Sequence, residues 1–198
     1  MSFSKHIWLW CNCFCLLFGG RLQAQIPTPS SVLGHTPGDD FYLANYEEAV
    51  KYFHVLAASS DRMKMFTVGK STQGRDIEVA VISSPENLAR LDEYKKIARQ
   101  LATAHGLNDE QARKLAHDSK VIVHIDGGLH SSEVAGGQHS IALAYKLISA
   151  KNDPEIDAIL SNVILVLWPT LNPDGMRWLR CRGSIRSTSA TTTIATVT

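Results

Sequence analysis

Cysteine is scarce in this sequence. Of four cysteines among 198 residues, three fall at Cys11, Cys13 and Cys15, and only Cys181 lies further along the chain. The three early cysteines belong to a segment that we expect to be removed, so no internal disulfide is left to form. The chain also has no Cys-x-x-Cys pair for zinc or redox chemistry. A disulfide-stapled scaffold and a cysteine-ligated zinc module are therefore excluded.

An excess of charge of either sign is also missing. The chain has 20 Lys and Arg against 19 Asp and Glu, so no overall basic field recruits nucleic acid, and we expect no nucleic-acid partner. Hydrophobic residues make up 44% of the chain, the balance of an ordinary water-soluble protein. At roughly 150 residues per domain, the length predicts one globular unit.

Long hydrophobic runs are absent except at the start of the chain. Lys5 and His6 precede an apolar run over residues 7–18, and the small residue Ala24 follows it. This order predicts a secretory signal peptide over residues 1–24. The alternative, a membrane anchor, is disfavoured because the run is too short to cross ~30 Å of hydrocarbon. We therefore expect a secreted or periplasmic protein that does not contact the membrane after cleavage.

Residue spacing predicts the elements of the first half of the chain. Residues 25–41 hold three prolines and two glycines and predict an extended lead-in. Apolar residues at three- and four-residue intervals predict a helix over residues 42–59. Two short strands, over 64–69 and 77–82, flank a Gly-containing turn and predict a hairpin.

Helices and apolar strands alternate in the second half. The expected helices and strands, in chain order, are helices over 86–104 and 108–117, a strand over 121–125, a helix over 133–150 and a strand over 162–168. Both strands are continuous apolar runs, which predicts that they are buried. The pattern predicts an α/β fold, a mixed sheet with helices on both faces.

The composition changes abruptly near residue 175. Residues 176–198 carry four arginines and no acidic residue, and nine of the fifteen residues from Ser184 onward are Ser or Thr. Such a segment has little to bury and predicts a disordered, low-complexity tail of foreign character. We expect a frameshift or premature end to have produced it, with the folded unit truncated.

One short stretch combines residues that bind metals. His130 and Glu133 stand three apart in a loop that contains Gly127 and Gly128 and follows the strand over 121–125. A loop at the carboxyl end of a strand is where open α/β sheets place their sites. Imidazole nitrogen and carboxylate oxygen are ligands of catalytic zinc. The pattern His-x-x-Glu recurs by chance, however, and alone it also fits an ordinary polar loop.

A second marker follows the strand over 162–168. Asn172, Pro173, Asp174 and Gly175 form a tight-turn sequence about 40 residues after the His-x-x-Glu pattern, with one expected helix and one expected strand between them. By itself this sequence indicates only a turn. The combination of the two markers in this order is much less common than either one.

Together these features resemble the N-terminal part of the zinc carboxypeptidase family, peptidase family M14, over about residues 42–175. The markers are the helix over 42–59, the hairpin with its turn over 69–75, His130-Ser131-Ser132-Glu133 and Asn172-Pro173-Asp174-Gly175. The resemblance implies that His130 and Glu133 are two ligands of one zinc ion and that the substrate is a peptide or protein.

The sequence also departs from the family pattern. The resemblance implies a further histidine ligand and a general-base glutamate downstream of the Asn-Pro-Asp-Gly turn, whereas the last histidine here is His139 and the last glutamate Glu155. We therefore assign no catalytic residue and no substrate-binding residue. Ser132 stands where members often have an arginine.

Other polar residues have simpler interpretations. We interpret His124 as a buried core histidine, His139 as a packing residue and Asp126 as the end of its strand, although Asp126 could also orient a ligand histidine. Gly74 and Arg75 fit turn chemistry better than anion binding.

Three functions remain open. The first is a zinc-dependent metallocarboxypeptidase, incomplete in this chain. The second is a non-catalytic fragment or pseudoenzyme that binds metal weakly. The third is a zinc deacylase of the succinylglutamate desuccinylase/aspartoacylase type, against which the Asn-Pro-Asp-Gly turn argues. A truncated sheet also predicts an exposed apolar edge around residues 163–168 and a tendency to aggregate.

Overall fold

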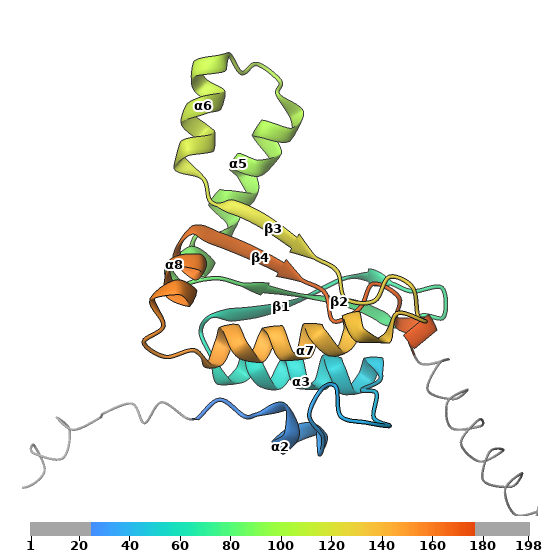
Figure 1. Ribbon diagram of the computed structural model, residues 1–198. Coiled ribbons are helices and arrows are strands. Elements are labelled where there is room, and N and C mark those ends of the chain that lie inside the picture. Colours follow the sequence, from blue (N-terminus) through green and yellow to red (C-terminus); the bar gives the residue numbers. More distant parts are fainter. Residues whose placement is uncertain (1–24, 177–198) are drawn as a thin grey trace, which may run out of the picture.

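A four-stranded sheet forms the centre of the computed structural model, which describes residues 25–176 (Figure 1). The strands lie in the order β1 (Met63–Lys70), β2 (Asp76–Ile82), β4 (Val163–Leu167) and β3 (Val121–Ile125). β2 is antiparallel to both β1 and β4, whereas β3 and β4 are parallel. The predicted hairpin and the predicted mixed α/β sheet are confirmed.

Two expected segments fall outside this description. The predicted signal peptide over residues 1–24 and residues 177–198 of the predicted tail lie outside the described residues. Between residues 25 and 176, no helix is both long and apolar enough to cross a membrane.

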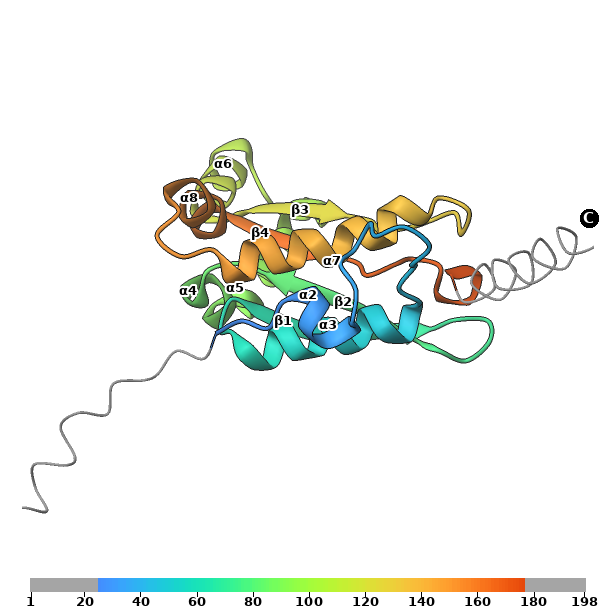
Figure 2. The same cartoon turned by 60° about the horizontal axis from the view of Figure 1, so that its bottom comes forward.

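One face of the sheet is covered by α3 (Tyr46–Ser59) and α7 (Val134–Ser149), which run side by side (Figures 1 and 2). Phe53 and Ile141 from these helices are fully buried in the main core. The apolar spacing predicted both helices. Asn45 begins α3 with a capping box, because its side chain accepts from the amide of Glu48 while the Glu48 carboxylate accepts from the amide of Asn45.

The other face is covered by α4 (Pro85–Ala89) and the beginning of α5 (Leu91–Thr103). Tyr94 packs there in a second cluster with Val81 of β2 and Ile164 of β4. Alternate residues of one strand point to opposite faces, so β2 and β4 serve both clusters. Helices on both faces of the sheet were predicted, and the prediction is confirmed.

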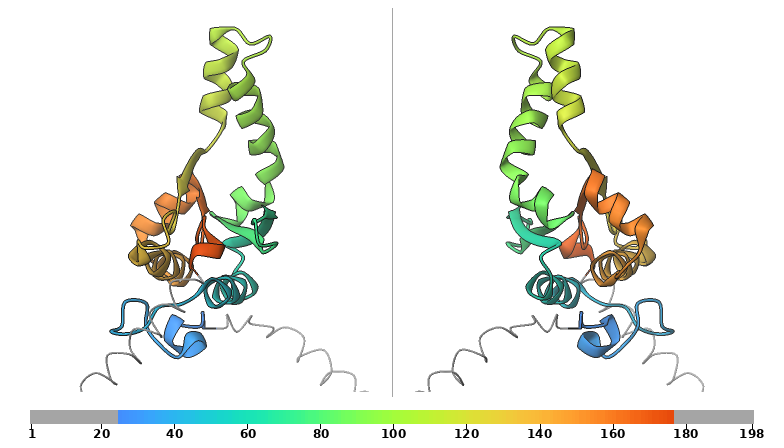
Figure 3. Two further views of the ribbon diagram at one scale, coloured as in Figure 1. Left: turned by 90° about the vertical axis from the view of Figure 1, so that its right-hand side faces the viewer. Right: turned by 90° about the vertical axis from the view of Figure 1, so that its left-hand side faces the viewer.

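α5 and α6 (Asp109–Asp118) form an arm that projects away from the sheet (Figures 1 and 3). α6 has no buried residue. α6 begins with a capping box: the Asn108 side chain accepts from the Gln111 amide, and the Gln111 side chain accepts from the Asn108 amide. Local capping therefore supports a helix that has little tertiary packing.

Two short helices differ from the sequence expectations. The lead-in over 25–41, expected to be extended, contains α2 (Pro29–Leu33), whose first turn is capped by the Thr28 side chain. The helix α8 (Pro154–Asn162) was not predicted. Asp153 caps this helix and Pro154 takes its first position, which is a typical start signal. The helix has only nine residues, so its apolar spacing is too short to indicate a helix.

The position of β3 corrects two predictions. The predicted apolar edge at 163–168 is wrong, because β4 lies between β2 and β3. In the described part of the chain β3 is one of the two edge strands, β1 being the other, and Val121 and Ile122 are 63% and 47% exposed. The strand over 121–125 was therefore wrongly predicted to be buried. Its apolar sequence is as continuous as that of an interior strand, so sequence alone does not distinguish the two positions.

Candidate metal centre

Two loops meet beyond the carboxyl ends of the parallel strands β3 and β4. The Leu171 amide donates to the carbonyl of Gly127 at 3.2 Å, which joins the loop after β4 to the loop after β3. A Cβ atom at residue 127 would lie 2.1 Å from Ser140 Oγ and 2.8 Å from the Trp168 carbonyl oxygen. Glycine is therefore required at 127 for this close approach.

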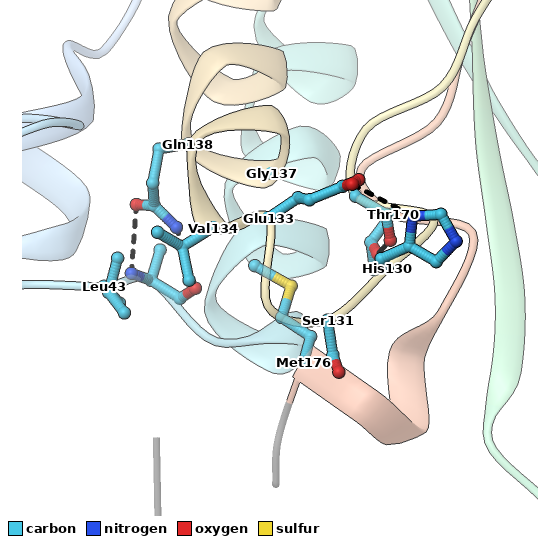
Figure 4. Close-up of a pocket in the computed structure, with 11 residues that line it drawn as sticks. Leu43, His130, Ser131, Glu133, Val134, Gly137, Gln138, Thr170 and Met176 are labelled. Atoms are coloured by element: carbon cyan, nitrogen blue, oxygen red, sulfur yellow. Dashed lines mark hydrogen bonds and ion pairs between the residues drawn. The ribbon is translucent and has the colours of Figure 1, made fainter. Parts of the chain in front are cut away.

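The predicted metal pair sits where the first of these loops enters α7 (Figure 4). His130 Nδ1 lies 3.0 Å from Glu133 Oε1, and the two side chains are 68% and 65% exposed. Glu133 holds the N-cap position of α7, but its side chain makes no capping hydrogen bond. Its carboxylate is therefore available to accept from the His130 ring, as the close spacing in sequence predicted.

The geometry of the pair fits a zinc ion in part. Two donor atoms each roughly 2.1 Å from a tetrahedral zinc ion are roughly 3.4 Å apart, and the observed separation of His130 Nδ1 and Glu133 Oε1 is 3.0 Å. Their nitrogen and oxygen donors are of the kind zinc takes. Within residues 25–176, no group of three or more His, Cys, Asp or Glu side chains is placed to hold a metal. The described residues thus offer two side chains of the kind that bind zinc, whereas a catalytic site takes three protein ligands.

The pair lines a pocket that is open to solvent (Figure 4). Leu43, Val134 and Met176 form what we call the apolar wall. Gln138 fixes this wall, because its side chain accepts from the Ala44 amide and donates to the Ala44 carbonyl, both at 3.1 Å. The pocket therefore combines one polar end with a braced apolar side.

Sequence reasoning missed a contact between the Asn-Pro-Asp-Gly turn and the β1–β2 hairpin. Arg75 pairs with Asp174, so the interpretation of Arg75 as turn chemistry alone is wrong. Partial burial acts to raise the pKa of Asp174, but hydrogen bonds from Arg75, Ser71 and the Gln73 amide outweigh it and lower the pKa. Asp174 and Arg75 are 99 residues apart, and no local pattern joins them.

Two other histidines differ from their expected roles. His124 is not a buried core histidine: its side chain is 52% exposed and its Nε2 lies 3.0 Å from Asp126 Oδ1. His124 belongs to β3, whose position at the edge of the described sheet leaves it open to solvent. His139 was expected to pack, but it is exposed on α7 and does not line the pocket.

Fold and site together define an α/β protein with a close histidine–glutamate pair in a loop that follows the carboxyl end of a parallel strand. The family model of peptidase M14, described as zinc carboxypeptidase, matches residues 50–192. The chain therefore belongs to the zinc carboxypeptidase family, as its resemblance indicated. The match continues past residue 175, where we expected the peptidase part to end, and the foreign origin of residues 176–198 stays a prediction.

Among solved structures, carboxypeptidase A from Helicoverpa armigera is similar to this chain, with a TM-score of 0.48 and 18% sequence identity. The alignment covers 74% of this chain and 31% of that structure, so the chain spans less than a third of the length of this relative. None of the curated proteins compared with the chain matches it.

Proposed function

We propose that this chain contributes His130 and Glu133 as two ligands of a zinc site that hydrolyses C-terminal peptide bonds of peptides or proteins. The observation that carries the proposal is the 3.0 Å contact between these side chains, in a pocket of a chain that belongs to the zinc carboxypeptidase family. A bound zinc ion would supply Lewis acidity toward the scissile carbonyl. Export through the predicted signal peptide would bring the protein to extracellular or periplasmic substrates.

The remaining pocket residues bind and orient rather than react. The apolar wall offers a surface to an apolar substrate side chain. Glu133 is the only carboxylate among the described residues that line the pocket. Since Glu133 is assigned to the metal, we assign no general base to residues 25–176.

The peptidase assignment is favoured over the deacylase alternative. The zinc carboxypeptidase model covers both the His-x-x-Glu pattern and the Asn-Pro-Asp-Gly turn. The turn is also part of the site, because the Asn172 side chain donates to the Leu129 carbonyl at 3.3 Å, next to His130.

A second candidate is a non-catalytic product that binds metal weakly. It is favoured by the described residues, in which His130 and Glu133 find no third metal-binding side chain. Two protein ligands hold zinc less well than three. The candidates differ in turnover, because both use the same pair but only the first hydrolyses a peptide.

The test is zinc binding by the chain from residue 25 to 198. Zinc affinity is measured by competition with a chromophoric chelator, alongside release of C-terminal amino acids from a peptide. We expect His130→Ala and Glu133→Ala each to weaken zinc binding by at least tenfold, the smallest loss typical of outer-shell changes at metal sites. Peptide hydrolysis that depends on both His130 and Glu133 would support the enzyme. Zinc binding without peptide hydrolysis would support the non-catalytic candidate.

The matched control is His117→Ala. His117 Nδ1 also lies near a carboxylate, 3.3 Å from Asp118 Oδ1, but on the exposed helix α6 and outside the pocket. We expect this variant to bind zinc as the unaltered chain does. Zinc binding that survives both pocket substitutions, or falls equally with His117→Ala, contradicts the proposed site.

A further inference from the structure

The turn of the β1–β2 hairpin surrounds one carboxylate from the far end of the described chain. The Asp174 carboxylate accepts from Ser71 Oγ at 2.9 Å, from the Gln73 amide at 3.1 Å and from the Arg75 guanidinium. The Arg75 and Asp174 side chains are each only 19% exposed. This enclosure distinguishes the contact from an ordinary surface ion pair, which contributes little.

The hairpin turn is itself well defined. The Ser71 amide donates to the Arg75 carbonyl at 2.8 Å, and the Arg75 amide donates to Ser71 Oγ at 3.0 Å. Arg75 Nη1 also donates to Gln73 Oε1 at 2.7 Å. The donors that meet Asp174 are therefore also held by hydrogen bonds within the turn itself.

On its other side, the segment that carries Asp174 rests on the loop of the metal pair. The Gly175 amide donates to Asn172 Oδ1 at 2.8 Å, and Asn172 Nδ2 donates to the Leu129 carbonyl at 3.3 Å. A Cβ atom at residue 175 would lie 2.7 Å from Ser131 Cβ, so the two segments are in direct contact. Leu129 and Ser131 are the two chain neighbours of His130.

We propose that Arg75 is a positioning residue for the metal pair: through Asp174 it holds the 172–175 turn against residues 128–131 and so fixes His130 opposite Glu133. Arg75 does not line the pocket and has no catalytic role. The proposal rests on the proposed function only for the identity of the metal. The mechanical link from Arg75 to His130 can be tested without it.

The experiment measures hydrogen exchange of the metal-free chain, unaltered and as Arg75→Gln and Asp174→Asn. The reporters are the amides of Glu133 and Gly175, which donate to the His130 carbonyl and to Asn172 Oδ1. We expect both variants to lose protection at these amides while amides in the middle of α7 keep theirs. Unchanged exchange at Glu133 and Gly175, or an equal loss throughout α7, overturns the proposal.

The control is Lys70→Gln. Lys70 pairs with Asp76 at 2.6 Å on the same hairpin, but both side chains are largely exposed and away from Asp174. We expect no change in exchange at Glu133 and Gly175.

Zinc affinity supplies a second measurement. We expect Arg75→Gln to weaken zinc binding by 10–100-fold, the loss typical of residues that orient metal ligands, while Lys70→Gln leaves it unchanged. Unchanged affinity in Arg75→Gln overturns the role of Arg75 at the metal. If the unaltered chain binds no zinc, the proposed function is contradicted. The hydrogen-exchange measurement then tests the link from Arg75 to His130 by itself.

Discussion

Asp174 shows how one side chain depends on a segment far away in sequence. The residues that bind its carboxylate precede it by 99 to 103 positions. The sequence around Asp174 indicates only an aspartate of the kind common in turns. His130 and Glu133 are the opposite case: they are three residues apart and lie 3.0 Å from one another, so their contact is local in sequence, and their shared role as metal ligands stays a prediction.

The lowered pKa of Asp174 predicts a pH-dependent stability. In the unfolded chain an aspartate titrates near about 3.9, whereas in the folded protein its pKa is lower. The charged carboxylate therefore stabilises the fold above that pH, and this contribution disappears as the pH falls through the folded pKa. We expect urea unfolding to show that Asp174→Asn is less stable than the unaltered chain at pH 5 to 7, and that the difference shrinks below about pH 4.

Asp76→Asn is the comparison for this measurement, because Asp76 forms an ion pair on the same hairpin with a side chain that is 49% exposed. A smaller loss of stability is expected there at pH 5 to 7, since solvent screens the ion pair. A stability difference for Asp174→Asn that persists undiminished at pH 3 would mean that the carboxylate charge is not its cause.

At the scale of elements, α4 and α8 are joined by one buried amide. Asn87 is 4% exposed, and its Nδ2 donates to Ser83 Oγ and to the carbonyls of Leu160 and Ser161 at 3.0 to 3.1 Å. The last carbonyls of a helix have no partner within the helix. Asn87 therefore completes the end of α8 and fixes the point at which the chain enters β4.

Replacing Asn87 by alanine removes the hydrogen-bond partner of the buried Tyr94 hydroxyl, which donates to Asn87 Oδ1 at 3.4 Å, and that of the Ser161 carbonyl. We expect Asn87→Ala to lower the free energy of unfolding by about 1–3 kcal/mol, measured by urea denaturation. Asn162→Ala is the matched control, because Asn162 also donates to a helix carbonyl, that of Ala158 at 2.9 Å, but at an exposed position. We expect Asn162→Ala to change the free energy of unfolding by no more than about 0.5 kcal/mol. Equal losses in the two variants would show that burial does not set the cost.

The elements also show how much the sequence could predict. Helix α3 was predicted from its apolar spacing alone, because that signal is local to the segment. The edge position of β3 was not, because burial of a strand depends on which strands flank it rather than on its own residues. The link between Arg75 and Asp174 was missed for the same reason, since it exists only after the sheet has formed.

At the scale of the whole molecule, the described sheet is well covered on its faces and open at the β3 edge. Val121 and Ile122 expose apolar side chains there, next to backbone groups of β3 that face away from β4. Such an edge is a template for pairing with another chain. The aggregation first expected at residues 163–168 is therefore assigned to β3.

We expect Ile122→Lys to reduce self-association, because a charged side chain on an edge strand opposes pairing between chains. Light scattering against protein concentration measures the effect, and the free energy of unfolding should change by no more than about 0.5 kcal/mol because the side chain is half exposed. Ile159→Lys is the control: Ile159 is 39% exposed on helix α8, and not on a strand. An equal reduction by both variants would indicate that net charge, not the edge, governs association.

Gln138 links the two ends of the pocket, because it lies on α7 and bonds to the backbone of Ala44. Glu133 is the N-cap residue of α7, and Gln138 lies just over one turn further along the same helix. The Gln138 side chain accepts from the Ala44 amide and donates to the Ala44 carbonyl. Any tilt of α7 therefore carries the Glu133 carboxylate and the Leu43 side of the cavity together. A ligand that displaced the backbone at Leu43 and Ala44 would either break these two hydrogen bonds or move the Glu133 carboxylate as well.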